Sequence, residues 1–237
     1  MICIKVKNMI YNVQYLPWDS QSFGFKVGKI VLTKKSSINT VALFEEMQRN
    51  NYKLIYLCTP FKVDIENFYD TKLVYAKTFC KHNEPLNEHI RSYKGKAITD
   101  VLLKLAFESG KYSRFNLDER FPKELFELLY YKWLENSIFT DFSTDVLVYE
   151  VNNMPVGLLT YKINKTKSSI GIISIAPEYQ GCGIGSSLMQ YYESILSNDI
   201  KTLEVITQGV NHVARMFYEK HGYSIAELCY VYHVWSK

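Results

Sequence analysis

The chain of 237 residues has 47% apolar and 22% charged residues and a formal net charge of +4, values ordinary for a soluble globular protein. This composition excludes disordered and collagen-like chains, and the mild charge without a dense basic block gives no reason to propose nucleic acid as a partner. The five cysteines are scattered without Cys-x-x-Cys spacing, so neither a disulfide framework nor a metal site is indicated.

Localisation follows from similar observations. No apolar run approaches the roughly eighteen residues that a membrane span requires, and the first residues lack the apolar core of a signal peptide. Scattered cysteines fit a reducing compartment. We therefore expect a cytoplasmic protein with no membrane partner.

The N-terminal part of the chain predicts a small α/β domain, residues 1–93. Apolar residues at helical spacing predict a helix over residues 37–51, and residues 64–69 predict a short helix or turn. Runs of β-branched and aromatic residues predict strands at 26–32, 53–58 and 73–79. This domain carries no evident catalytic constellation, and one interpretation is that it is an incomplete copy of the domain that follows.

A polar segment, residues 82–96, contains Pro85 and Gly95 and predicts a linker. The second predicted domain, residues 94–237, begins with a helix from residue 97. An aromatic and charged loop, residues 112–121, and a second helix, residues 122–136 with its proline in the first turn, come next.

A hairpin follows these helices. Its strands, residues 145–151 and 155–164, are joined at Asn152-Asn153, and the second strand pairs through another turn with a strand at 170–176. Pro177 ends that strand before a glycine-rich turn and a helix from about residue 184. The next predicted element is a strand at residues 201–207. A helix at residues 211–221, ended by a glycine, and closing strands at 223–235 follow it.

The glycine-rich turn carries the chemical signal. Gln180, Gly181, Gly183 and Gly185 are spaced so that successive backbone N–H groups can face one point at the start of the next helix. The helix macrodipole is positive there and side chains are minimal. The turn therefore predicts a site for phosphate or pyrophosphate.

Three other interpretations of this turn compete. A P-loop would need a lysine after its last glycine, but Gly185 is followed by serine, so this alternative is excluded. A dinucleotide-binding turn is closer, because Gly181, Gly183 and Ser186 approximate its pattern and Glu204 lies downstream. Such a turn follows its strand tightly, however, and here several residues intervene. A glycine-rich loop that only starts a helix is the third alternative.

The pattern Gln-x-x-Gly-x-Gly at residues 180–185, after a strand and before a helix, resembles the acetyl-coenzyme A signature of the GNAT family of N-acetyltransferases. The order of the predicted elements is also that of the GNAT fold. The resemblance implies an α/β GNAT fold, with a mixed, splayed β-sheet flanked by helices. It also implies acetyl-coenzyme A as cosubstrate, with the pantetheine arm in the cleft where the sheet splays.

Short stretches outside the turn are similar to the TDP-fucosamine acetyltransferases within this family. These stretches are Trp18-Asp19 with Phe23-Gly24, Ser113-Arg114-Phe115, residues 131–136, and residues 205–208 followed by Asn211 and Tyr218. Those enzymes acetylate the 4-amino group of a dTDP-linked 4-amino-4,6-dideoxygalactose for surface polysaccharide. The closer resemblance therefore implies a nucleotide-linked amino sugar as the acceptor.

The resemblance also assigns site residues. Tyr218, seven residues after Asn211, is the candidate catalytic proton donor to the departing thiolate, with a core tyrosine as the alternative. Asn211 would bind pantetheine, cap the following helix, or do both. A backbone N–H near a bulge before Pro177 would bind the oxyanion. The predicted coenzyme-binding set is Ile173, Ser174, Ile175, Gln180, Gly181, Cys182, Gly183, Ile184, Gly185, Ser186, Asn211 and Tyr218.

On the acceptor side, Arg114 with Tyr112 and Phe115 is expected to grip a sugar diphosphate, and Gln208 completes the predicted substrate set. An ion pair with a nearby carboxylate is the alternative for Arg114. We disfavour Cys182 as a covalent nucleophile, because no base accompanies it.

The sequence does not identify the general base. The carboxylates nearest in sequence to the glycine-rich turn are Glu178 and Glu204. Neither they nor the histidines His212 and His221 give a clear signal.

The leading hypothesis is an acetyl-coenzyme A-dependent N-acetyltransferase that acts on a nucleotide-linked amino sugar by direct attack in a ternary complex. One alternative acceptor is an amino acid, a polyamine or a protein amine. An acidic acceptor cleft with Arg114 directed away from it would favour that alternative. A second alternative is a non-catalytic acyl-coenzyme A-binding module. For assembly, we consider a homodimer through the closing strands.

Overall fold

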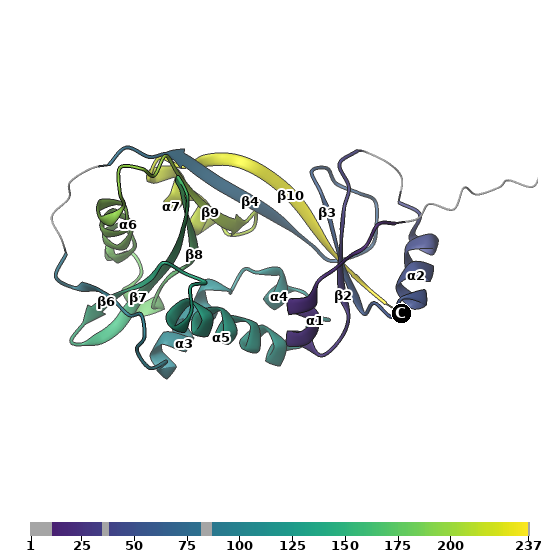
Figure 1. Ribbon diagram of the computed structural model, residues 1–237, viewed down its shortest axis with the longest axis horizontal. Helices are drawn as coiled ribbons and strands as arrows, with labels where there is room; N and C mark the ends of the chain where they lie inside the picture. Colours follow the sequence, from purple (N-terminus) through teal and green to yellow (C-terminus); the bar gives the residue numbers. More distant parts are fainter. Residues whose placement is uncertain (1–10, 35–37, 82–86, 237) are drawn as a thin grey trace, which may run out of the picture. The chain divides into compact units, whose positions relative to one another are not determined.

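The computed structural model describes residues 11–34, 38–81 and 87–236 (Figure 1). Of these residues, those up to Lys72, together with the C-terminal segment from Leu228, form one compact unit, and those from Leu73 to Glu227 form a second. These bounds differ from the predicted domains, residues 1–93 and 94–237. The reason is that the chain passes between the units twice, within β4 (Tyr69–Thr78) and β10 (Ser224–Trp235).

The first unit is a small sheet with helices. Strand β2 pairs in parallel with β3, and the C-terminal part of β10 pairs with β3 antiparallel. Helix α2 buries Leu43 and Met47 against Ile55 and Leu57 of the central strand. Its complete elements are β1 (Gln14–Tyr15), α1 (Pro17–Phe23), β2 (Val27–Val31), α2 (Thr40–Arg49) and β3 (Leu54–Thr59).

The second unit has a mixed sheet. Strands β5 to β8 pair antiparallel in sequence order, β9 pairs with β8 in parallel, and β4 follows β9. The strands are β5 (Ile90–Ser92), β6 (Asp145–Val151), β7 (Met154–Asn164), β8 (Lys167–Ile175) and β9 (Thr202–Gln208). The helices are α3 (Asp100–Ser109), α4 (Arg114–Leu117), α5 (Lys123–Phe139), α6 (Ile184–Ile195) and α7 (His212–Lys220).

Alternating side chains build two cores on the two faces of this sheet. Leu147 and Leu159 pack with Leu188 of α6 on one face. Their strand neighbours Val146 and Leu158 pack on the other face with side chains of α3 and α5. Figure 1 shows α6 on the opposite side of β6, β7 and β8 from α3 and α5. This mixed sheet between helices confirms the predicted α/β fold class.

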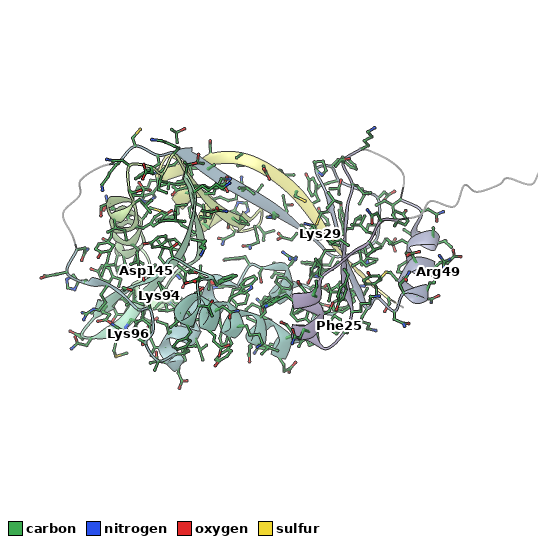
Figure 2. All side chains as sticks on the ribbon, in the orientation of Figure 1. Phe25, Lys29, Arg49, Lys94, Lys96 and Asp145 are labelled. Atoms are coloured by element: carbon green, nitrogen blue, oxygen red, sulfur yellow. The ribbon has the colours of Figure 1, made fainter. Side chains whose placement is uncertain are left out.

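Turn and capping residues fix the ends of these elements. Asn152 and Asn153 have φ values of 51° and 62°, the left-handed pair that a tight hairpin turn requires. At the end of α5, the ammonium of Lys94 (Figure 2) donates to the carbonyl oxygens of Ser137 and Thr140 at 2.9 and 2.6 Å. A lysine there satisfies carbonyls that have no partner within the helix and lies at the negative end of its dipole.

Four local predictions differ from the structure. The predicted linker contains β5, which pairs with β6 in the register Ile90↔Tyr149. Residues 82–86 of that linker lie outside the described residues. So does Ser37, the first residue of the predicted helix at 37–51. The predicted loop at 112–121 contains α4. The expected closing strands are the single strand β10. Residues 64–68 are irregular. Among the helices that the structure describes, none is long and apolar enough to cross a membrane.

Candidate active site

Strands β8 and β9 diverge in the middle of β8. They pair only from Lys167↔Thr202 to Ile170↔Val205, although β8 continues to Ile175 along β7. The β7–β8 register shifts directly after Ile170, and the N–H of Ile172 donates to Thr160 Oγ1 at 2.9 Å in place of a backbone carbonyl. A bulge bends its strand and increases its twist. The bulge therefore accounts for the splay between β8 and β9.

Beyond the bulge, β8 has one free edge. The N–H of Ala176 donates to the carbonyl of Val156 on β7 at 2.8 Å, so alternation directs the backbone groups of Ser174 toward β7 as well. The backbone groups of Ile173 and Ile175 then face the gap left by β9. The side-chain amide of Gln180 donates to the Ile175 carbonyl at 3.0 Å.

The predicted strand, turn and helix are all present after this edge. Gly181 and Gly183 have φ values of 79° and 82°, which only glycine adopts at low cost. Gly183 is the N-cap of α6, and no side chain caps this end. The first backbone N–H groups of α6 have no acceptor within the helix. They make this end suitable for an anion.

A cavity of about 390 Å³ joins these features. Twelve of the predicted site residues line it: Tyr112, Ile173, Ser174, Ile175, Gln180, Gly181, Gly183, Ile184, Gly185, Ser186, Asn211 and Tyr218. The other lining residues were not predicted from the sequence and are Glu108, Ser109, Lys111, Tyr179, Val213, Ala214, Phe217 and Lys220. The end of α3 forms part of the cavity wall. Helical periodicity predicts that helix from the sequence but does not indicate that its end borders a site.

Tyr218 belongs to both the core and the cavity wall. Its side chain is 3% exposed, and its ring lies 5.8 Å from that of Tyr75 and 5.6 Å from that of Phe217. Burial raises the pKa of the Tyr218 hydroxyl above its ordinary value. The phenol therefore stays protonated at neutral pH, as a hydrogen-bond donor must.

Asn211 caps helix α7. Its side-chain oxygen accepts a hydrogen bond from the Ala214 N–H at 3.1 Å, which is the capping role that the sequence left open. The amide also carries two N–H donors that this cap does not use. Because Asn211 lines the cavity, capping leaves the amide nitrogen available to a ligand.

Four predicted site residues do not line this cavity. Cys182 is exposed on the turn, and Gln208 ends β9, where its carbonyl accepts from the Asn211 N–H at 3.0 Å. Phe115 is 4% exposed and packs 5.2 Å from Phe121. The guanidinium of Arg114 stacks 4.2 Å from the Phe115 ring. Apolar residues in a short helix next to α5 thus form core where the sequence predicted an acceptor loop.

The carboxylates near the site also differ in whether they line the cavity. Glu178 is exposed, and Glu204 forms an ion pair with Lys167 at 2.6 Å; neither lines the cavity. Glu108 lines it and lies 3.5 Å from the Lys111 ammonium. Across residues 11–34, 38–81 and 87–236, no group of three or more histidine, cysteine or acidic side chains is placed to hold a metal ion.

Residues 143–225 match the family model described as acetyltransferase (GNAT) domain. A comparison with curated proteins found no match. Among solved structures, a functionally unknown conserved protein from Staphylococcus epidermidis is 13% identical with a TM-score of 0.64, covering 100% of this chain and 96% of that one. At this identity the likeness concerns the fold alone.

Two GNAT structures are also similar. A tandem GNAT protein from the clavulanic acid biosynthesis pathway is 8% identical with a TM-score of 0.53, covering 89% of this chain and 75% of that one. A putative GNAT acetyltransferase from Novosphingobium aromaticivorans is 11% identical with a TM-score of 0.52, covering 78% and 74%. The matched domain contains the splayed strands, the glycine turn and Tyr218. The chain thus carries a GNAT acetyltransferase domain at residues 143–225 and is an acyl-coenzyme A-dependent N-acetyltransferase.

Proposed function

We propose that this enzyme transfers the acetyl group of acetyl-coenzyme A directly to a primary amine in a ternary complex at the cleft between β8 and β9. One observation carries the proposal. The open N-terminus of α6, the free edge of β8 and the buried hydroxyl-bearing Tyr218 all border the same cavity of about 390 Å³. Anion binding, strand pairing and hydrogen-bond donation are the three interactions that a pyrophosphate, a pantetheine arm and a thiolate need.

The coenzyme would bind as follows. The pyrophosphate lies at the first turn of α6, against the N–H groups of residues 180–186, where the helix dipole favours negative charge. Lys220, which also lines the cavity, adds positive charge. The pantetheine amides pair with the cleft-facing backbone groups of β8 as an added strand would, and the amide nitrogen of Asn211 donates to them.

The reacting groups would then be held by two donors. The N–H of Ile173 is the first cleft-facing amide after the bulge and donates to the thioester oxygen as charge develops there. The hydroxyl of Tyr218 donates to the departing sulfur. Both donors belong to regular secondary structure, Ile173 to β8 and Tyr218 to α7, and packing of these elements restricts where the donors lie.

For the acceptor, the proposed class is a nucleotide-linked amino sugar of the dTDP-4-amino-4,6-dideoxyhexose type, as used for surface polysaccharide. This choice rests on the short sequence stretches similar to the TDP-fucosamine acetyltransferases. A simple amine, such as an amino acid or polyamine, is the second candidate. The support for this second candidate is that Glu108 lines the cavity whereas Arg114 does not.

Thiol release from acetyl-coenzyme A tests the proposal, with dTDP-4-amino-4,6-dideoxyhexoses, UDP-amino sugars, amino acids and polyamines as acceptors. We expect turnover on at least one amine and none on the hydroxy analogue of that acceptor. Turnover confined to nucleotide sugars supports the first acceptor class, and turnover on simple amines supports the second. Tight acetyl-coenzyme A binding with no turnover on any amine would instead indicate a binding module and reject the proposal.

A further inference from the structure

The acetyl acceptor needs a base that the sequence does not identify. An alkylamine has a pKa of about 10 and is an ammonium at neutral pH, so it must lose a proton before it can attack. A group that takes this proton directly must lie in the cavity that holds the thioester. Candidates can therefore be found by elimination among the lining residues.

Only one lining residue is suitable. Glu108 is the single carboxylate among the lining residues of the described chain, and none of those residues is a histidine. The remaining titratable groups on the wall are lysines and tyrosines, side-chain types whose reference pKa values are about 10. They are Lys111 and Tyr112 in the loop after α3, Tyr179 in the turn before α6, and Tyr218 and Lys220 on α7.

Glu108 also lies on the side where an acceptor would enter. It belongs to the last turn of α3, which covers the face of the sheet opposite α6. The hydroxyl of Ser174 donates to the Leu105 carbonyl at 2.6 Å, and this bond fixes α3 to β8 one turn before Glu108. A coenzyme arm that starts at α6 and passes between β8 and β9 would present its thioester to this opposite face.

The charges around Glu108 suit an ammonium ligand. Its carboxylate already lies 3.5 Å from the Lys111 ammonium, and the two side chains are 24% and 55% exposed, respectively. An ion pair that is open to solvent on its lysine side is weak, so a substrate ammonium can replace the lysine. Glu108 also lies at the C-terminal end of α3, where the helix dipole adds negative potential.

We propose that Glu108 binds the acceptor ammonium and acts as its general base, an inference that rests on the proposed acetyl transfer. The carboxylate takes one proton from the ammonium and later releases it to solvent. The neutral amine attacks the thioester carbonyl, so a C–N bond forms and the C–S bond breaks. A second nitrogen proton leaves with the thiolate to give the free thiol, and the amide keeps one N–H. A cationic amine is therefore the substrate class.

Glu108→Gln tests this assignment, with Glu178→Gln as a matched control because Glu178 is exposed and does not line the cavity. The probe is the amine that gives the fastest thiol release with the wild type, measured from pH 6.5 to 9.5. We expect kcat/KM of Glu108→Gln to fall about 100-fold or more at pH 7. It should then rise about tenfold per pH unit as free amine becomes available, and Glu108→Asp should recover part of the loss. Acetyl-coenzyme A affinity should stay within about twofold of wild type in all three variants.

Other outcomes separate the two claims. A Glu108→Gln enzyme with the wild-type rate and pH profile would overturn the assignment while acetyl transfer stands. An equal loss at every pH would also overturn it, because the carboxylate would then serve binding alone. If the wild type acetylates no amine, the proposed function fails first and the assignment of Glu108 fails with it.

Discussion

Tyr218 shows how burial restricts the chemistry of a single residue. An ordinary phenol has a pKa of about 10 and an ordinary thiol about 8.5, so proton transfer from tyrosine to a thiolate is already unfavourable. Burial raises the pKa of the Tyr218 hydroxyl and makes this transfer less favourable still. We therefore expect Tyr218 to stabilise the departing sulfur by a hydrogen bond, a narrower role than the proton donor that the sequence predicted.

Tyr218→Phe should lower kcat about 10- to 100-fold, because a hydrogen bond to a charged group contributes about 1.5–3 kcal/mol. Acetyl-coenzyme A affinity, measured by calorimetry, should change little. Tyr192→Phe is the control: its buried hydroxyl donates to Ser168 Oγ at 2.7 Å and does not line the cavity. An equal loss of kcat in both variants would mean that Tyr218 acts through packing alone.

Some site residues can be predicted from the sequence around them, and others depend on contacts with distant parts of the chain. Gly181 and Gly183 were predictable because left-handed backbone conformations demand glycine. Glu108 was not, because its role depends on where the end of α3 meets β8, a contact between residues far apart in sequence. Arg114 and Phe115 have the composition of a binding loop, but Phe115 packs against Phe121 and belongs to the core.

At the scale of elements, the bend of β8 determines the site. Sequence periodicity predicts the strand, and a lone Gly171 within it is a sign of a bulge. A Cβ at Gly171 would lie 2.9 Å from Thr160 Oγ1, so the close approach of the two strands depends on this glycine. The acceptor for the Ile172 N–H comes from β7, and this long-range partner cannot be predicted from β8 alone.

Thr160→Val should remove the acceptor for the Ile172 N–H without changing side-chain volume much. Because Thr160 is buried, we expect a loss of about 1–3 kcal/mol in the free energy of unfolding, measured by urea denaturation. Acetyl-coenzyme A should also bind severalfold more weakly as the bulge relaxes. Thr144→Val is the control, because Thr144 Oγ1 accepts from the Ile163 N–H at 2.8 Å in an exposed position outside the splay. A wild-type affinity in Thr160→Val would separate the bulge from coenzyme binding.

At the scale of the whole molecule, the sequence could not predict that the chain passes between the two units twice, within β4 and within β10. Strand β10 pairs with β3 in the register Val231↔Cys58, which joins residues that are far apart in the sequence. Local periodicity identifies each strand but contains no information about such a partner. The predicted domain boundary at 93/94 was placed at a polar segment, whereas the division into units follows long-range contacts within β4 and β10.

Stability at alkaline pH is a further property of the whole fold. Tyr161, Tyr192, Tyr218 and Tyr223 are buried in the second unit, and desolvation is the main cause that raises the pKa of each. For Tyr161 the pKa rises to about 12. An unfolded chain releases these protons near pH 10 and the folded chain does not. The unfolded state then binds fewer protons, so the free energy of unfolding is intact below pH 10 and falls as the pH rises.

Tyr161→Phe isolates one such group. At pH 11 the tyrosine is mostly ionised in the unfolded chain and mostly protonated in the folded chain. Because pH 11 lies one unit above the pKa of an unfolded tyrosine, this difference lowers the free energy of unfolding of the wild type by about 1.4 kcal/mol. We expect the fall in unfolding free energy between pH 9 and 11, measured by urea denaturation and circular dichroism, to be smaller in Tyr161→Phe by about this amount. Tyr15→Phe, at a side chain that is 48% exposed, should leave the fall unchanged. Equal falls in all three proteins would mean that burial of Tyr161 does not couple its titration to folding.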